Sequence, residues 1–349
     1  MPAAARFVDG HVDTVLALDD PRDLATRRPT GHLDLVRARE GGVAAAFFAV
    51  FVEPQHAEDL TAALSAREPP YAQPLAAAID RTFAAGKAAE RVALLLELER
   101  ACAGEARVAL TAADVDDAVA GGPLAVIVHF EGAEPIDAEL EALEEWYERG
   151  LRSVGIVWSR PNAFAEGVPF QFPASPDTGP GLTDAGRRLV RECNRLGILL
   201  DVSHLNERGF WDVAELSETP LAATHSNAHA LCASTRNLTD AQLDEIARSG
   251  GVVGLTIHAG MLRADGRVDS DTPLERFVEH VDYVADRIGI DHVAFGSDFD
   301  GALVLDAVGD VSKLPRLAEA LRGRGYTEPE IEKFAHENWL RVLRTTWRP

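Results

Sequence analysis

The sequence has few cysteines and no long apolar run. Only Cys102, Cys193 and Cys232 occur in 349 residues, and they are widely spaced. Their number and spacing exclude a disulfide framework and a Cys-x-x-Cys metal site, so we expect buried, reduced thiols. No apolar run reaches the roughly 18–20 residues that a membrane-spanning helix requires. We therefore expect a globular protein that does not cross a membrane.

Basic residues are scarce relative to acidic ones. The chain has 34 Lys and Arg against 56 Asp and Glu, a formal net charge of −22. Such a charge repels nucleic acid and anionic membrane surfaces, so neither is an expected partner. The first ten residues, MPAAARFVDG, hold no apolar core of a secretory signal, and the last seven, LRTTWRP, hold no hydrophobic tail. These features predict a cytoplasmic location.

Eight apolar runs recur along the chain, and a helical pattern follows nearly all of them. The runs are FVDGHVDTV, VAAAFFAVFV, LAVIVHFEG, RSVGIVWS, GILLDVSHL, PLAATHS, GGVVGLTIHAG and DHVAFGSDFDG. Their nearly continuous apolar character is typical of parallel strands that are buried on both faces. The alternation predicts an α/β fold, a (β/α)₈ TIM-type barrel forming one domain over residues 1–349. A doubly wound sheet is the alternative, but no glycine-rich dinucleotide loop follows the first strand.

Residues 53–122 have the character of a helical insertion between the second and third strands. They contain a proline-rich turn, REPPYAQP, and a pattern that predicts a long helix over about 75–103. A short strand–helix unit, RVALTAADVDDAVAGG, ends the segment.

Capping residues predict the limits of several other helices. Thr183 and Gly197 mark the start and end of one helix, Thr239 the start of a second, and Pro273 the first turn of a third. Residues 160–181 are rich in Pro, Gly and Phe, so we expect an ordered loop that covers a site.

Polar residues gather at the predicted carboxyl ends of the strands, where (β/α)₈ barrels carry their functional groups. This set, which includes five of the 11 histidines, is His11, Asp13, His129, Glu131, His204, His225, His258, Asp298 and Asp300. Imidazole and carboxylate ligands suit Zn²⁺ better than Mg²⁺ or Ca²⁺. His11 and Asp13 lie two apart on one strand and so face the same side, and Glu131 is the best carboxylate to bridge two ions.

Several segments resemble the signature segments of the renal (membrane) dipeptidase family of binuclear zinc metallopeptidases. They are GHVDT, HFEG, LLDVSHLN, ATHSNAHALCASTRN and AFGSDFDG, in the family's order, followed by ENWLRVL near the C-terminus. The combination is specific, although each piece alone is not. The chain is therefore identified as a soluble, bacterial-type member of this amidohydrolase-like family.

The resemblance implies a set of ligands and roles at matching positions. It implies two Zn²⁺ ions per chain, with His11 and Asp13 on one, His204 and His225 on the other, and Glu131 bridging them. It also implies that Asp298 holds or deprotonates the bridging water and that Arg236 pairs with the C-terminal carboxylate of a dipeptide. By the same resemblance we expect a homodimer that hydrolyses L,L- and L,D-dipeptides.

The chain departs from the family at the end of the fourth strand. Family members have a histidine there that contacts the substrate, whereas this sequence has Trp158 in VWSRPN. An indole offers one N–H donor and cannot act as an acid or a base. We hypothesise that His258, or less favourably the deeper His129, takes over part of the missing role.

Simpler or different interpretations stay open at this point. Asp298 can shape a turn and Arg236 can form a surface ion pair, and His32 and His229 are expected to be structural. The alternative enzyme is another amidohydrolase, acting on N-acyl amino acids, cyclic amides or lactones. That group generally opens its first strand with His-x-His, whereas this chain has His-x-Asp. A metal-binding barrel without catalysis is the third reading, favoured only by Trp158.

Overall fold

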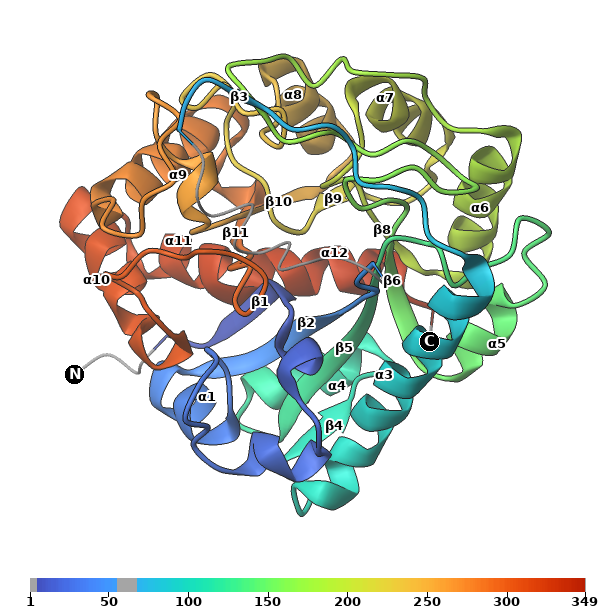
Figure 1. Ribbon diagram of the computed structural model, residues 1–349. Helices are drawn as coiled ribbons and strands as arrows, with labels where there is room; N and C mark the ends of the chain where they lie inside the picture. Colours follow the sequence, from blue (N-terminus) through green and yellow to red (C-terminus); the bar gives the residue numbers. More distant parts are fainter. Residues whose placement is uncertain (1–4, 55–67, 349) are drawn as a thin grey trace.

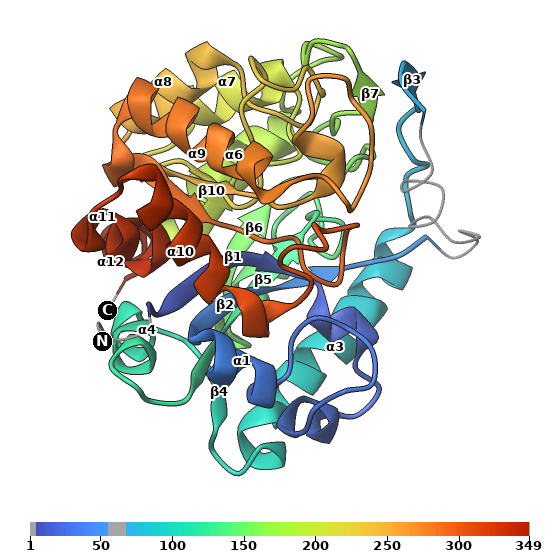
Figure 2. The same cartoon turned by 90° about the vertical axis from the view of Figure 1, so that its left-hand side faces the viewer.

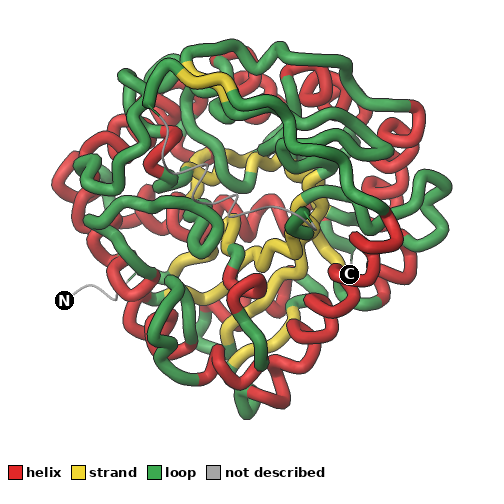
Figure 3. Tube along the Cα trace, in the orientation of Figure 1, coloured by secondary structure: helices red, strands yellow, loops and turns green. Residues whose placement is uncertain are grey.

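Eight parallel strands form a barrel at the centre of the molecule (Figures 1 and 3). The computed structural model describes residues 5–54 and 68–348. The strands follow one another around the barrel in chain order: β1 (Phe7–Val12), β2 (Val43–Phe51), β5 (Leu124–Glu131), β6 (Leu151–Gly155), β8 (Leu199–Asp201), β9 (Ala222–Ala223), β10 (Val252–Leu255) and β11 (Val293–Phe295). The predicted (β/α)₈ fold is thereby confirmed.

The barrel closes just beyond the end of β11. The backbone N–H of Asp298 donates to the carbonyl of His11 over 3.0 Å, and that of Asp13 donates to the carbonyl of Phe299 over 2.8 Å. Segments that are far apart in the sequence therefore meet at one point of the barrel rim.

Helices surround the barrel, so that both faces of each central strand are covered (Figures 1 and 2). They are α1 (Leu35–Gly41), α5 (Leu143–Glu148), α6 (Asp184–Leu196), α7 (Glu207–Leu216), α8 (Asp240–Arg248), α9 (Leu274–Ile288), α10 (Pro315–Arg324) and α11 (Glu328–Glu332). β2 and β5 are buried along their whole length, as their continuous apolar runs predict. No helix in the described part of the chain is long and apolar enough to cross a bilayer.

The predicted helix limits agree closely with the structure. Thr183 caps α6 by accepting from the N–H of Gly186, and Gly197 ends it in the left-handed conformation. Thr239 caps α8. Pro273 is the residue before α9 and not part of its first turn, so that prediction was wrong by one position.

The segment between β2 and β5 contains α3 (Arg81–Ala101), β4 (Ala106–Val108) and α4 (Ala112–Val119). α3 is shorter than predicted because Asp80, which accepts from the N–H of Phe83, caps it. β4 pairs in parallel with β5, so this segment extends the barrel's sheet. Residues 55–67 of the predicted insertion lie outside the described part of the chain, and the single-domain assignment stays a prediction.

Two loops cross the rim of the barrel side by side. β3 (Tyr71–Ala72) pairs with β7 (Gln171–Phe172), which lies within the predicted covering loop (Figure 2). The N–H of Gln73 donates to the carbonyl of Phe170 over 2.9 Å, and that of Ala76 donates to the carbonyl of Ser159 over 3.0 Å. These bonds fix the loop segments that adjoin the pocket described below.

Helix α12 (Asn338–Thr346) crosses the amino-terminal end of the barrel and forms its floor (Figure 1). Its fully buried Trp339 donates from the indole N–H to the carbonyl of Phe295 over 2.9 Å. Above it, glycines create room for β9. A β-carbon on Gly10, Gly254 or Gly296 would lie 2.6, 2.2 or 1.8 Å from the carbonyl oxygen of Thr224. The backbone at Thr224 can therefore approach three other strands closely.

We predict that Gly254→Ala destabilises the protein by about 1–3 kcal/mol, because the new methyl group overlaps the Thr224 carbonyl. Chemical denaturation in urea measures this change. Gly323→Ala is the matched control, since a β-carbon at Gly323 in α10 meets nothing within 4 Å. That control should gain up to about 1 kcal/mol from helix propensity. An unchanged urea midpoint for Gly254→Ala would contradict the close approach of the strands.

Candidate active site

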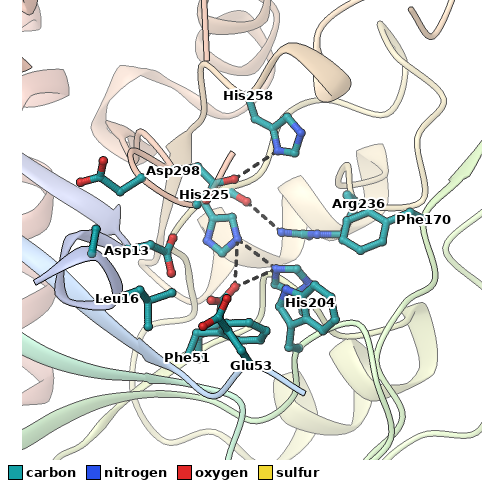
Figure 4. A pocket seen from close by; sticks show the side chains of 15 residues that line it. Asp13, Leu16, Phe51, Glu53, Phe170, His204, His225, Arg236, His258 and Asp298 are labelled. Carbon is teal, nitrogen blue, oxygen red and sulfur yellow. Dashed lines mark hydrogen bonds and ion pairs between the residues drawn. The ribbon is translucent and has the colours of Figure 1, made fainter. Parts of the chain in front are cut away.

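The nine residues to which the sequence assigns a role as ligand, catalytic group or substrate contact lie near or after the carboxyl ends of the barrel strands, with Arg236 in the loop between β9 and α8. Apart from His11, which is fully buried below, they line a single pocket. The lining members are Asp13, Glu131, Trp158, His204, His225, Arg236, His258 and Asp298. Figure 4 shows most of them projecting into one space from different strands. The barrel thus brings together residues that are far apart in the sequence.

Glu131 stands between two pairs of side chains. On one side, Nε2 of His204 lies 3.1 Å from Oε1 of Glu131, and Nε2 of His225 lies 3.9 Å from the same oxygen. On the other side, Nε2 of His11 lies 3.7 Å from Oε2 of Glu131 and 3.4 Å from Oδ2 of Asp13. One carboxylate therefore faces both halves of the cluster with different oxygens.

The spacing of these atoms matches that of metal ligands. Two donors bound about 2.0–2.1 Å from a tetrahedral zinc ion lie roughly 3.3 Å apart. The Nε2 atoms of His204 and His225 are 3.1 Å apart, and the donor atoms of His11 and Asp13 are 3.4 Å apart. His11, Glu131 and His225, and likewise His11, Asp13 and Asp298, offer ligand atoms within 4.8 Å of one another.

The electrostatics of the His11 half call for a positive charge. Nε2 of His11 is buried and has no hydrogen-bond partner. Burial alone would lower the pKa of His11, but the charges of Glu131 and Asp13 raise it well above its usual value. Burial raises the pKa of Asp13 to about 7, and the neighbouring charge of Glu131 adds to this. A cation bound at this point would satisfy the orphaned nitrogen and both carboxylates.

The other two histidines are neutral, as metal ligands must be. Burial and the positive charge of Arg236 together lower the pKa of His204 to about 4. Burial also lowers the pKa of His225 well below its usual value. The donor set of neutral imidazoles and carboxylates therefore fits metal ions such as Zn²⁺.

Asp298 sits above the cluster and contacts His258. Its Oδ2 lies 3.1 Å from Nδ1 of His258, which is half-buried at the pocket wall (Figure 4). Asp298 has a φ of 67°. This left-handed conformation is uncommon for a residue with a β-carbon and tends to occur at functional sites. The hydrogen bond from its N–H to the carbonyl of His11 holds the residue there.

Arg236 is buried at the side of the pocket. It donates from Nη1 to the carbonyl of Ser203 over 3.2 Å and from Nη2 to the carbonyl of His225 over 3.3 Å. Burial lowers its pKa to about 10, so the guanidinium stays charged at neutral pH. Its five N–H donors exceed these two bonds, which leaves donors for an anionic ligand.

Three aromatic rings line the same pocket. Trp158 lies with its ring centroid 5.0 Å from Phe51, 5.7 Å from Phe170 and 6.0 Å from His204. Sequence reasoning missed Phe51 and Glu53, although both follow from their place at the end of β2. It expected aromatic residues of the covering loop near the site without naming Phe170.

Three other residues considered in the sequence analysis, of which Asp300 lines the pocket, have hydrogen-bond partners of their own. His129 is fully buried below the cluster, where its Nδ1 lies 2.9 Å from Oγ of Ser153. Asp300 accepts from Oγ1 of Thr14 over 2.6 Å and from the N–H of His32 over 2.7 Å. His229 contacts the carbonyl of Ala174 through Nε2 over 2.8 Å. These contacts are structural in kind.

Comparisons with known proteins agree over nearly the whole chain. The family model for membrane dipeptidase (peptidase family M19) matches residues 2–348. A metallo peptidase from Rhodobacter sphaeroides, liganded with a phosphinate mimic of the dipeptide L-Ala-D-Ala, has a TM-score of 0.95 and 49% identity, with 99% of this chain and 100% of that chain covered. A metallo peptidase of family M19, dipeptidase AC, has a TM-score of 0.92 and 48% identity, with 99% of each chain covered. Dipeptidase tcpJ of Claviceps purpurea (strain 20.1) is 29% identical over 348 residues, 97% of this chain and 76% of that protein.

We predict that Glu131→Gln retains at most half of the metal bound by the wild type, because the amide supplies one neutral oxygen where the carboxylate faces both halves. Metal analysis after dialysis measures the content per chain. Glu53→Gln, the same substitution at the exposed rim of the same pocket, should keep the full content. Equal metal content per chain in the two variants would show that Glu131 is not a metal ligand.

Proposed function

Because the chain belongs to the membrane dipeptidase family of metallopeptidases, peptidase family M19, we propose that it hydrolyses dipeptides with a free C-terminal carboxylate by means of two Zn²⁺ ions. Family membership confirms the resemblance of the signature segments and the prediction of a metallo-dipeptidase. The observation that carries the proposal is the position of Glu131, whose two oxygens face separate pairs of metal-ligating side chains.

These distances support the ligand sets that the resemblance implies. His11 and Asp13 would hold one zinc ion, His204 and His225 would hold the other, and Glu131 would contact both. Two zinc ions at these positions would polarise the scissile carbonyl and lower the pKa of a shared water molecule.

Asp298 is proposed to move the proton during hydrolysis. Its Oδ2 contacts His258, which leaves Oδ1 to take a proton from the attacking water. As the water oxygen bonds to the carbonyl carbon and the C–N bond breaks, the same oxygen returns the proton to the leaving amine. This path forms one carboxylic acid and one free amine, so atoms and charges balance.

Arg236 and the aromatic wall are proposed to position the substrate. A guanidinium fork suits bidentate binding of a carboxylate, and Arg236 has donors to spare. In the same pocket, Phe51, Trp158 and Phe170 would contact an apolar substrate side chain. The indole N–H of Trp158 is the one donor that this wall offers.

We further propose that both L,L- and L,D-dipeptides are accepted. Support comes from the Rhodobacter sphaeroides metallo peptidase, which binds a phosphinate mimic of L-Ala-D-Ala. The homodimer and the cytoplasmic location stay predictions.

The experiment that tests this function combines metal analysis with a substrate panel. The purified, metal-replete chain is assayed against L,L- and L,D-dipeptides, the corresponding dipeptide amides, and N-acyl amino acids. We expect two zinc ions per chain, turnover of free dipeptides, and a large loss of kcat/KM for the amides, which lack the carboxylate that Arg236 binds. Removal of the metal by a chelator should abolish turnover, and added Zn²⁺ should restore it.

Two results would overturn the proposal. Turnover confined to N-acyl amino acids, cyclic amides or lactones would assign the chain to a different hydrolytic reaction. Two bound metal ions without turnover of any of these substrates would indicate a metal-binding barrel without catalysis.

We predict that His258→Ala lowers kcat/KM for a good dipeptide about 100-fold, the lower end for a group that assists proton transfer. The imidazole contacts Asp298 and lines the pocket, so it can take over part of the role of the histidine that Trp158 replaces. His129→Ala should change kcat/KM only a few-fold, because His129 is buried below the pocket.

Steady-state kinetics on both variants distinguish the two histidines. If His258→Ala also stays within a few-fold of the wild type, the compensation hypothesis is wrong. A larger effect at His129 than at His258 would reverse the assignment.

A further inference from the structure

Thr224 lies directly below the two halves of the metal cluster, immediately after β9. It is fully buried, and its carbonyl occupies the space left by the glycines of three other strands. Its hydroxyl oxygen is 2.7 Å from Oδ2 of Asp201, 2.9 Å from Nδ1 of His225 and 3.4 Å from Nδ1 of His11. A single hydroxyl thus contacts one histidine from each half.

Asp201 fixes the direction of the hydroxyl proton. Its carboxylate accepts from the N–H and the hydroxyl of Ser203 over 3.0 and 2.7 Å, and from the N–H of Thr224 over 2.8 Å. Burial alone would raise the pKa of Asp201, but the nearby His129 and these hydrogen bonds lower it below its usual value. An ionised carboxylate can only accept hydrogen bonds, so the Thr224 hydroxyl must donate its one proton to Asp201.

The lone pairs that remain on the Thr224 hydroxyl oxygen determine which ring nitrogen of the two histidines carries a proton. After its proton is used, the oxygen of Thr224 offers only lone pairs. The Nδ1 atoms of His225 and His11 can bond to it only as N–H donors. In a neutral imidazole the other nitrogen, Nε2, then carries the lone pair that a metal ion needs.

We propose that Thr224 is a positioning residue that sets the tautomer of His225 and His11 together, and so presents Nε2 of both to the two metal ions. Its consequence for metal binding rests on the proposed function, whereas the hydrogen bonds of Thr224 are present in the chain itself. The third histidine has a support of its own: Nδ1 of His204 lies 3.0 Å from Oγ of Ser159.

Nε2 of His11 is buried without a hydrogen-bond partner, and the two carboxylates beside it favour a proton there when no metal ion is bound. With the other proton held on Nδ1 by Thr224, a bound cation would take the place of the Nε2 proton. Hydrogen bonds of this kind to ligating histidines typically contribute 10–100-fold to metal affinity.

The test compares Thr224→Val, which removes the hydroxyl at nearly constant shape, with Thr224→Ser, which keeps it. Zinc dissociation constants are measured by competition with a chromophoric chelator. Thr224→Val should raise the zinc dissociation constant of the His204–His225 half 10–100-fold and that of the other half by a smaller factor. Both constants of Thr224→Ser should stay within about threefold of the wild type. Ser159→Ala should weaken zinc binding at only one of the two sites, the one that contains His204.

A second measurement reads the tautomers without any metal. In the metal-free wild type labelled with ¹⁵N-histidine, long-range proton–nitrogen spectra should show neutral His225 protonated at Nδ1. The preference of His225 for protonation at Nδ1 should be lost in Thr224→Val and kept in Thr224→Ser.

The outcomes separate the two proposals. A wild type with His225 protonated at Nε2, or a Thr224→Val variant that binds both ions as tightly as the wild type, would overturn the role of Thr224. This holds even if the valine variant folds poorly, because the wild-type spectrum alone decides the tautomer. A wild type that shows the expected tautomers but binds no zinc or cleaves no dipeptide would instead overturn the proposed function.

Discussion

The crowding of buried carboxylates at the barrel mouth is the constraint on which the rest of the site depends. Asp13, Glu131 and Asp298 are each less than one-tenth exposed and converge within a few ångströms of His11. Removing charges from water is costly unless they are paired. Without a cation, the proton on His11 is the available compensation. The closed barrel holds these groups together through hydrogen bonds such as that from the N–H of Asp298 to the carbonyl of His11. A metal ion bound among them would lower their electrostatic free energy.

Much of this arrangement follows from simple rules of sequence. Eight apolar runs predict eight parallel strands, and their carboxyl ends must meet at one face. The spacing of His11 and Asp13 predicts that both side chains point the same way, and the structure places their ligand atoms 3.4 Å apart. Helix ends at Thr183 and Gly197 were also predictable, because caps are local and depend on only a few neighbouring residues.

Features that depend on distant neighbours could not be predicted. The contact of Thr224 with Asp201 and two histidines joins three strands, and nothing in the neighbouring sequence distinguishes this threonine from others. The short strand β4 was predicted from RVALTAADVDDAVAGG, but its pairing with β5 was not, since pairing depends on residues far away in the sequence.

Helix α12 at the base of the barrel links the completion of the site to the order in which the chain is synthesised. His11 is synthesised long before Trp339, which β1 and β10 approach closely at Gly10 and Gly254. Domains generally fold as units during or after synthesis. A nascent chain that stops before Asn338 already contains every proposed ligand and yet lacks the base on which the barrel closes. The floor of the barrel is therefore supplied by a segment that follows every proposed ligand in the chain.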